Sequence, residues 1–202
     1  MYIRSEMKKR AKYMFSAQYG ISICAYILFV FIVGAVGISG IGALLLFPPL
    51  LVGYSAFCIN IWRGGRGEIG FMFNNGFSDF GRNLGGILWM QLFIFLWSLL
   101  FVIPGIIKTF AYSMTPYILA DCPKVRPTEA LKLSMRMTQG HKGKIFVLQL
   151  SFIGWLLLSG LTGGILNLLY VGSYMGTSMA GMYDTLRYDA LTRGVIRQEE
   201  LT

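Results

Sequence analysis

The chain has 202 residues, of which 55% are hydrophobic and only 13% are charged, and its formal net charge is +9. A soluble domain carries about 25% charged residues, so the composition excludes an ordinary water-soluble domain. The charges are also unevenly spread, because residues 13–62 contain no Asp, Glu, Lys or Arg. Since soluble helices need a polar face, we expect one integral membrane domain over residues 1–202.

A basic segment, Arg4–Lys12, precedes the first apolar run, and we interpret it as part of an anchor that stays attached. One crossing of a bilayer needs about 20 apolar residues, so two crossings fit before Arg63. We predict helices at 19–36 and 41–62, joined by a glycine-rich turn. Pro48 and Pro49 would kink the second of these helices or mark where its ordered part begins.

Two further apolar stretches each hold a pair of helices, the first broken at Pro104-Gly105 and the second at Gly160–Gly164. The predicted bounds of these four helices are 84–103, 105–120, 145–161 and 164–183. The expected fold is therefore all-α: a polytopic transmembrane helical bundle of about six short helices in three hairpins. The fourth and fifth helices are short, so four or five crossings, with one re-entrant or tilted segment, is the alternative.

Lysine and arginine are concentrated in the segments that three hairpins would place on one side of the membrane. The two chain ends and the loops 63–83 and 121–144 contain every Lys and Arg except Lys108. Because cytoplasmic loops accumulate Lys and Arg, both termini are expected to be cytoplasmic.

Each long loop contains an amphipathic segment that we predict to be a cytoplasmic helix. The first carries an apolar face that includes Phe71 and Phe77, and the second begins at Pro127-Thr128-Glu129. Basic amphipathic helices bind anionic lipid headgroups, or they can simply cover the end of a helical bundle. The basic residues expected to contact headgroups or a protein partner are Lys132, Arg136, Lys142 and Lys144.

Few side chains in the apolar runs carry chemistry. Lys108 is expected close to the outer surface, either reaching water along its stem or binding an anionic headgroup or substrate. The residues that would line a small polar cavity are Gln91, Gln149, Tyr112 and Tyr174. Hydrogen bonding between helices is the simpler explanation of such polar groups.

A stripe of small residues, Gly172, Gly176 and Ala180, predicts close packing of helices within one chain or between chains. No base–nucleophile pair, metal-ligand spacing or phosphate-binding glycine loop is visible, and His141 is the single histidine. We therefore expect no enzyme activity, no metal and no cofactor. The positive-inside bias explains the basic charge without nucleic acid.

The sequence resembles the domain of unknown function 975 family of bacterial integral membrane proteins. The resemblance rests on Leu92–Asp121, Glu129–Ser134, Gly140–Lys144, Leu150–Leu158 and Val52–Phe57. It implies a multi-helix fold in a bacterial cell membrane and brings no activity. More loosely, the layout is similar to the membrane domain of some glycerophosphodiester phosphodiesterases, which is a fold-level analogy.

Two functional hypotheses follow. In the first, the protein binds or translocates a lipid-like or amphiphilic small molecule, because broken short helices with Gly/Pro turns are typical of repeat-built transporters. In the second, it is a non-transporting scaffold, accessory or immunity protein that acts through a partner or as a homo-oligomer. Membrane lipids, including anionic headgroups, are expected partners under either hypothesis.

Overall fold

The computed structural model describes residues 4–201, and every regular element within them is helical. This confirms the all-α prediction. The α-helices are α1 Arg4–Ala17, α2 Tyr19–Gly37, α3 Gly40–Trp62, α4 Ile69–Phe77, α5 Phe80–Leu100, α6 Val102–Tyr112, α7 Thr115–Asp121, α8 Pro127–Thr138, α9 Lys142–Leu150, α10 Ile153–Leu161 and α11 Gly172–Thr192. A π-helical turn, Asn167–Val171, precedes α11, and a 3₁₀ turn, Gln198–Leu201, lies near the C-terminus.

Helices α2 and α3 form the first hairpin and occupy almost the residues predicted for it. Ser39 caps α3, because its hydroxyl accepts a hydrogen bond from the Gly42 amide at 3.2 Å. Pro48 lies inside α3 without ending it. In the most apolar stretch of α3, 56% of the residues are buried, against 17% in the most apolar stretch of α2. Helix α3 is therefore the central helix of the molecule.

The second hairpin differs from the prediction at its turn. Helix α5 ends at Leu100, and the break falls at Phe101, whose backbone is extended, instead of at Pro104-Gly105. Pro104 lies in the first turn of α6, where its missing amide hydrogen costs nothing. The returning segment is also not one helix, since it breaks between α6 and α7 at Ser113-Met114.

The third hairpin is less regular than predicted. Its first half breaks between α9 and α10 at Ser151-Phe152, and its turn uses Gly163 and Gly164, both with positive φ. Its second half continues as α11 to Thr192, beyond the predicted end at residue 183, and this extension carries charged side chains.

By length and composition, four helical segments of the described chain can cross a membrane: Tyr19–Gly37, Gly40–Trp62, Phe80–Leu100 and Lys142–Leu161. Helix α6 has 11 residues, so it is about 16 Å long, half of a bilayer core. Six crossings therefore stay a prediction. Large apolar side chains are exposed at the hairpin ends, including Ile38 (90%) and Leu161 (85%), as expected for surfaces covered by lipid.

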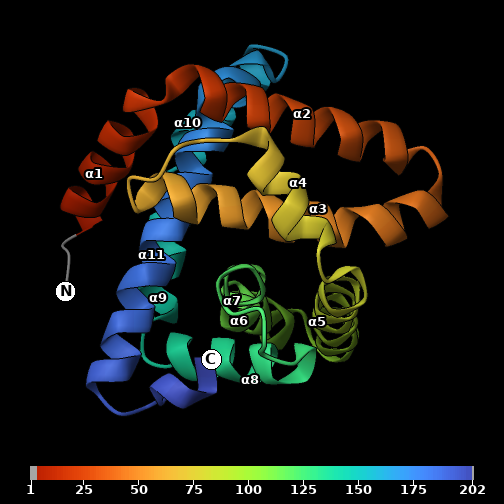
Figure 1. The fold of residues 1–202 in the computed structure, drawn as a ribbon, viewed down its shortest axis with the longest axis vertical. Helices are drawn as coiled ribbons and strands as arrows, with labels where there is room; N and C mark the ends of the chain where they lie inside the picture. The colour runs from red at the N-terminus through yellow and green to blue at the C-terminus, as the bar shows by residue number, and fades with distance from the viewer. Residues whose placement is uncertain (1–3, 202) are drawn as a thin grey trace.

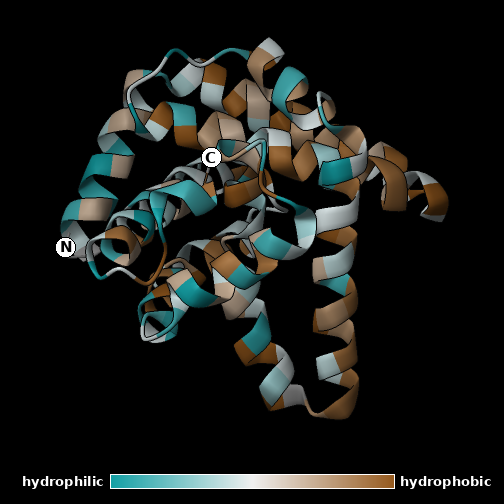
Figure 2. Ribbon diagram, turned by 60° about the horizontal axis from the view of Figure 1, so that its bottom comes forward, coloured by the Kyte–Doolittle hydropathy of each residue, from teal (hydrophilic) through white to brown (hydrophobic). Residues whose placement is uncertain are grey.

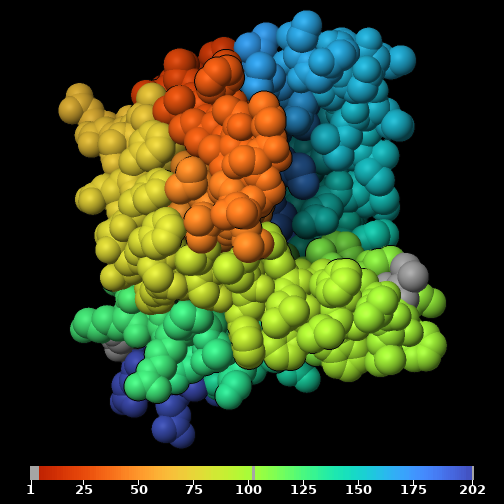
Figure 3. All heavy atoms as spheres, turned by 90° about the vertical axis from the view of Figure 1, so that its right-hand side faces the viewer, coloured from red at the N-terminus to blue at the C-terminus, as the bar shows by residue number. Residues whose placement is uncertain are grey.

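The three hairpins diverge from one another instead of running parallel. In Figure 1, α2 and α3 lie across the view, α5 is seen nearly along its axis, and α11 runs from top to bottom. Figure 2 shows hydrophobic residues over the protruding hairpin ends and hydrophilic residues near the chain termini. In Figure 3, the end of the α2–α3 hairpin faces the viewer, and a recess separates it from the C-terminal third of the chain.

The predicted small-residue stripe packs within the chain. A side-chain carbon at Gly176 would lie 2.9 Å from both the Cys58 sulfur and the Tyr54 hydroxyl of α3, and Gly172 faces Tyr26 of α2. These glycines therefore allow α11 to approach the first hairpin closely.

Both predicted amphipathic segments are helical, as α4 and α8. Helix α8 is packed into the protein, because Leu131, Leu133 and Met137 are buried. The buried Ser134 hydroxyl donates to the Ala111 carbonyl at 2.8 Å and accepts from the Met114 amide at 3.3 Å. The break between α6 and α7 is thus held by a side chain of α8.

Candidate functional site

Charged residues gather at the ends of α3 and α7 and in the middle of α11. Arg63 follows α3, Asp121 ends α7, and Asp184 lies on α11. The Arg63 guanidinium donates to Asp121 at 2.5 and 3.0 Å and to Asp184 at 2.6 Å. Arg187 donates to Asp121 at 2.8 Å, and the Tyr183 hydroxyl donates to it at 2.9 Å. We call these five residues the charged hub.

The charged forms of Asp121 and Arg63 are favoured in the hub. Burial opposes ionisation of Asp121, but the hydrogen bonds and charge of Arg63, with the charge of Arg187, outweigh it and lower the pKa of this carboxyl. Burial likewise disfavours the charged form of Arg63, yet the two carboxylates raise its pKa. The Asp121 side chain is only 11% exposed. The hub is therefore a fixed ionic connection between the three hairpins.

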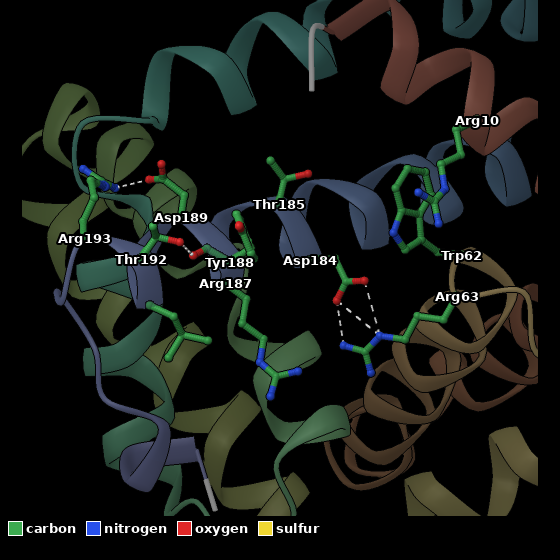
Figure 4. A pocket seen from close by; sticks show the side chains of 11 residues that line it. Arg10, Trp62, Arg63, Asp184, Thr185, Arg187, Tyr188, Asp189, Thr192 and Arg193 are labelled. Atoms are coloured by element: carbon green, nitrogen blue, oxygen red, sulfur yellow. Dashed lines mark hydrogen bonds and ion pairs between the residues drawn. The ribbon is translucent and has the colours of Figure 1, made fainter. Parts of the chain in front are cut away.

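An open groove of about 700 Å³ lies beside the hub and is lined mainly by α11 (Figure 4). Its charges are largely paired: Asp184 binds Arg63 at one end, and Asp189 binds Arg193 at the other. His141 adds a contact to Asp189 at 3.6 Å. Arg10 stacks on the Trp62 ring at 4.8 Å. We call this the arginine groove, and both carboxylates of its lining are paired with arginines.

A second groove, of about 430 Å³, lies between α6 and α8 and differs in charge. It is lined by Lys108, Lys132, Arg136, Lys142, Ala111, Met135 and Gln139, and we call it the lysine groove. Arg136 pairs with Glu200 at 2.7 Å, and this hydrogen bond lowers the pKa of Glu200. Within residues 4–201, no carboxylate forms an ion pair with the three lysines. The lysine groove therefore has excess positive charge.

Lys108 is held in the lysine groove by one sulfur contact and two cation–π contacts. Its ammonium lies 3.7 Å from the Met135 sulfur, 5.0 Å from the Trp97 ring centre and 5.6 Å from that of Tyr112. Cation–π contacts of this kind hold a lysine without neutralising it. Lys108 on α6 therefore lies beside α8, which belongs to the loop 121–144. Its expected position near the outer surface stays a prediction.

The residues predicted to line a polar cavity do not converge. Gln91 is exposed on α5, and Gln149 is half-buried on α9. Tyr112 is buried beside Lys108, whereas Tyr174 packs against Phe152 at 5.2 Å between ring centres. Since Gln91 faces outward, these four side chains enclose no shared space.

Among the basic residues predicted to contact headgroups, Lys132, Arg136 and Lys142 come together in the lysine groove, and Lys144 lies exposed outside its lining. Sequence reasoning missed the charged hub. The available signal was that Arg63, Asp121 and Asp184 each directly follow a predicted membrane helix. No cluster of His, Cys, Asp or Glu that fits a metal ion occurs in the described part of the chain.

The fold is that of an all-helical protein with four helices long and apolar enough to be embedded in a membrane. The family model for proteins of unknown function named DUF975 matches residues 84–190, more than half of the chain, and the chain belongs to this family. The match contains all the residues that line the lysine groove. No curated protein and no solved structure matches the chain.

Proposed function

We propose that this protein is a non-enzymatic, integral protein of a bacterial cell membrane that binds an anionic amphiphile in the lysine groove. The observation that supports the proposal is the groove's charge: four cationic side chains line it, and only Arg136 has a carboxylate partner. Each Lys or Arg near an anionic membrane surface contributes about 1 kcal/mol to binding. Three unpaired lysines therefore supply about 3 kcal/mol of attraction for an anionic headgroup.

Helix α6, which carries Lys108, also offers exposed apolar surface for the apolar part of the same ligand. Ile103 and Ile106, in the turns of α6 before Lys108, are 72% and 52% exposed. Trp97 and Tyr112, beside the Lys108 ammonium, are residue types that favour the boundary between headgroups and hydrocarbon. An amphiphile would place its anionic group on the lysines and its chains along α5 and α6.

The proposal includes an orientation. The positive-inside bias places both termini and the loops 63–83 and 121–144 in the cytoplasm, so the lysine groove opens near the cytoplasmic leaflet. The multi-pass topology and the cytoplasmic termini are parts of this proposal, as is the absence of enzyme activity.

Quenching of Trp97 fluorescence by lipids with brominated chains tests the proposal. Subtracting the emission of the Trp97→Phe variant from that of the wild type isolates the Trp97 signal from that of the other tryptophans. In reconstituted wild-type protein, anionic brominated lipid should quench this signal more strongly than zwitterionic brominated lipid. The double variant Lys132→Gln/Lys142→Gln should lose the difference, and Lys124→Gln, in the same loop but outside the groove, should keep it. Equal quenching by both lipids in the wild type would overturn the proposal.

A second candidate function is that of an accessory protein that acts through a partner. Stacked phenylalanines on α4 and the start of α5 favour it: Phe73 and Phe77 lie 6.3 Å apart, and Phe77 and Phe80 lie 6.2 Å apart. Phe71, Phe77 and Phe80 are each 37–38% exposed. Co-purification that is lost in Phe71→Ser/Phe77→Ser and kept in the lysine variants would support this function.

A further inference from the structure

The charge of the lysine groove exceeds what a common phosphodiester headgroup neutralises. Glu200 already pairs with Arg136, which leaves Lys108, Lys132 and Lys142 as three lysines around one space that form no ion pair with a carboxylate of residues 4–201. A phosphodiester carries one negative charge, so two lysines would stay unpaired beside it. A headgroup with two or more negative charges fits the groove better, because unpaired like charges in a shared space repel.

The type and position of the cations agree with a terminal phosphate. Lysine ammonium groups act as compact point charges with three donors each, and they can surround the exposed oxygens of a phosphate from different directions. Lys132 comes from α8, Lys142 from the start of α9 and Lys108 from α6. Donors from three elements thus face one space, and Lys108 is already positioned by Trp97 and Met135.

The exposed apolar surface of α6, the helix that carries Lys108, indicates a lipid source for this phosphate. Ile103, Ile106 and Ile107 are 72%, 52% and 46% exposed on the helix that carries Lys108. A soluble phosphate compound would use the lysines and leave this surface uncovered.

We propose that the ligand of the lysine groove is a lipid whose headgroup ends in a phosphate monoester or diphosphate. The inference rests on the proposed function and narrows its ligand class. Selectivity comes from the second negative charge, since a lipid of the same chains with a phosphodiester headgroup meets the same apolar surface.

Competition binding in lipid nanodiscs tests the inference. The full-length protein is titrated with dioleoyl phosphatidic acid, which ends in a phosphate monoester, and with dioleoyl phosphatidylglycerol, a phosphodiester, in a phosphatidylcholine background. We expect phosphatidic acid to bind at least about fivefold more tightly, because each further charge near the lysines adds about this factor. The ratio should approach one in Lys132→Gln/Lys142→Gln and stay unchanged in Lys124→Gln. Glycerol 3-phosphate should compete only weakly.

The outcomes separate the two proposals. Equal binding of the two anionic lipids, both reduced by the lysine variants, would overturn the inference and leave the proposed function standing. No preference of either anionic lipid over phosphatidylcholine would overturn both. Competition by glycerol 3-phosphate at concentrations close to those of phosphatidic acid would show that the ligand is a soluble phosphate, which also overturns the inference.

Discussion

Replacing Asp121 by Asn removes the carboxylate that joins α3 to α11. Asp121 accepts two hydrogen bonds from Arg63, one from Arg187 and one from Tyr183. Asparagine keeps one oxygen, but it loses the charge and leaves Arg187 without its carboxylate partner.

The expected loss of stability follows from these contacts. A hydrogen bond to a charged group contributes about 1.5–3 kcal/mol, and breaking a buried ion pair costs about 3–5 kcal/mol. Arg63 is 36% exposed and keeps Asp184, so solvent and the second carboxylate reduce the cost. We therefore expect Asp121→Asn to lower the free energy of unfolding by about 2–4 kcal/mol.

Reversible denaturation in mixed micelles measures this change. The matched control is Asp79→Asn, because Asp79 is 50% exposed and lies 3.8 Å from Arg82, so its loss should cost under about 0.5 kcal/mol. A double-mutant cycle with Arg187→Gln should give a coupling energy of about 1 kcal/mol or more. If Asp121→Asn costs no more than Asp79→Asn, the hub does not hold the hairpins together.

The pKa of the Asp121 carboxyl is lowered in the folded protein, so its contribution to stability is present above its unfolded pKa of about 4. This contribution is lost as the pH falls through the folded pKa. The free energy of unfolding of the wild type should therefore fall more steeply with pH below pH 4 than that of Asp121→Asn. Gly176→Ala should destabilise the protein by about 1–3 kcal/mol because its new carbon meets Tyr54 and Cys58, whereas Gly160→Ala, which meets nothing within 4 Å, should be tolerated. In a variant without native cysteines, Ile38→Cys should react with an impermeant thiol reagent added to intact cells and Lys124→Cys should not; native Cys122 is buried, so its labelling would be uninformative on either side.

The parts of the fold that follow from local sequence signals could be predicted. The first hairpin is such a case, since a long charge-free stretch is divided by Gly37–Gly40, and α8 is another, since Pro127 marks its first turn. The turn of the second hairpin was predicted at Pro104-Gly105 but lies at Phe101. A Pro-Gly pair is found both in turns and in the first turn of a helix, so the sequence did not distinguish the two. The end of α11 could not be predicted, because hydropathy indicates where a membrane crossing ends, and the helix continues past residue 183 to Thr192.

The candidate site could be predicted only in part, because it depends on contacts between distant segments. Lys132 and Arg136 are four residues apart on one helix, so their common face is visible in the sequence. Lys108 joins them only because α8 folds back against α6 through Ser134 and Ala111. The pairing of Arg63 with Asp121 and Asp184 likewise spans three hairpins. The sequence shows that each of them directly follows a predicted membrane helix, but not that they pair.

Native mass spectrometry of the protein extracted from its own membrane in mild detergent shows whether the lysine groove holds a lipid. We expect a stoichiometric anionic lipid on the wild type, present equally on Lys124→Gln and lost from Lys132→Gln/Lys142→Gln. A wild-type chain that carries no lipid, or that arrives only with a second protein, would contradict lipid binding in the lysine groove and favour the accessory function.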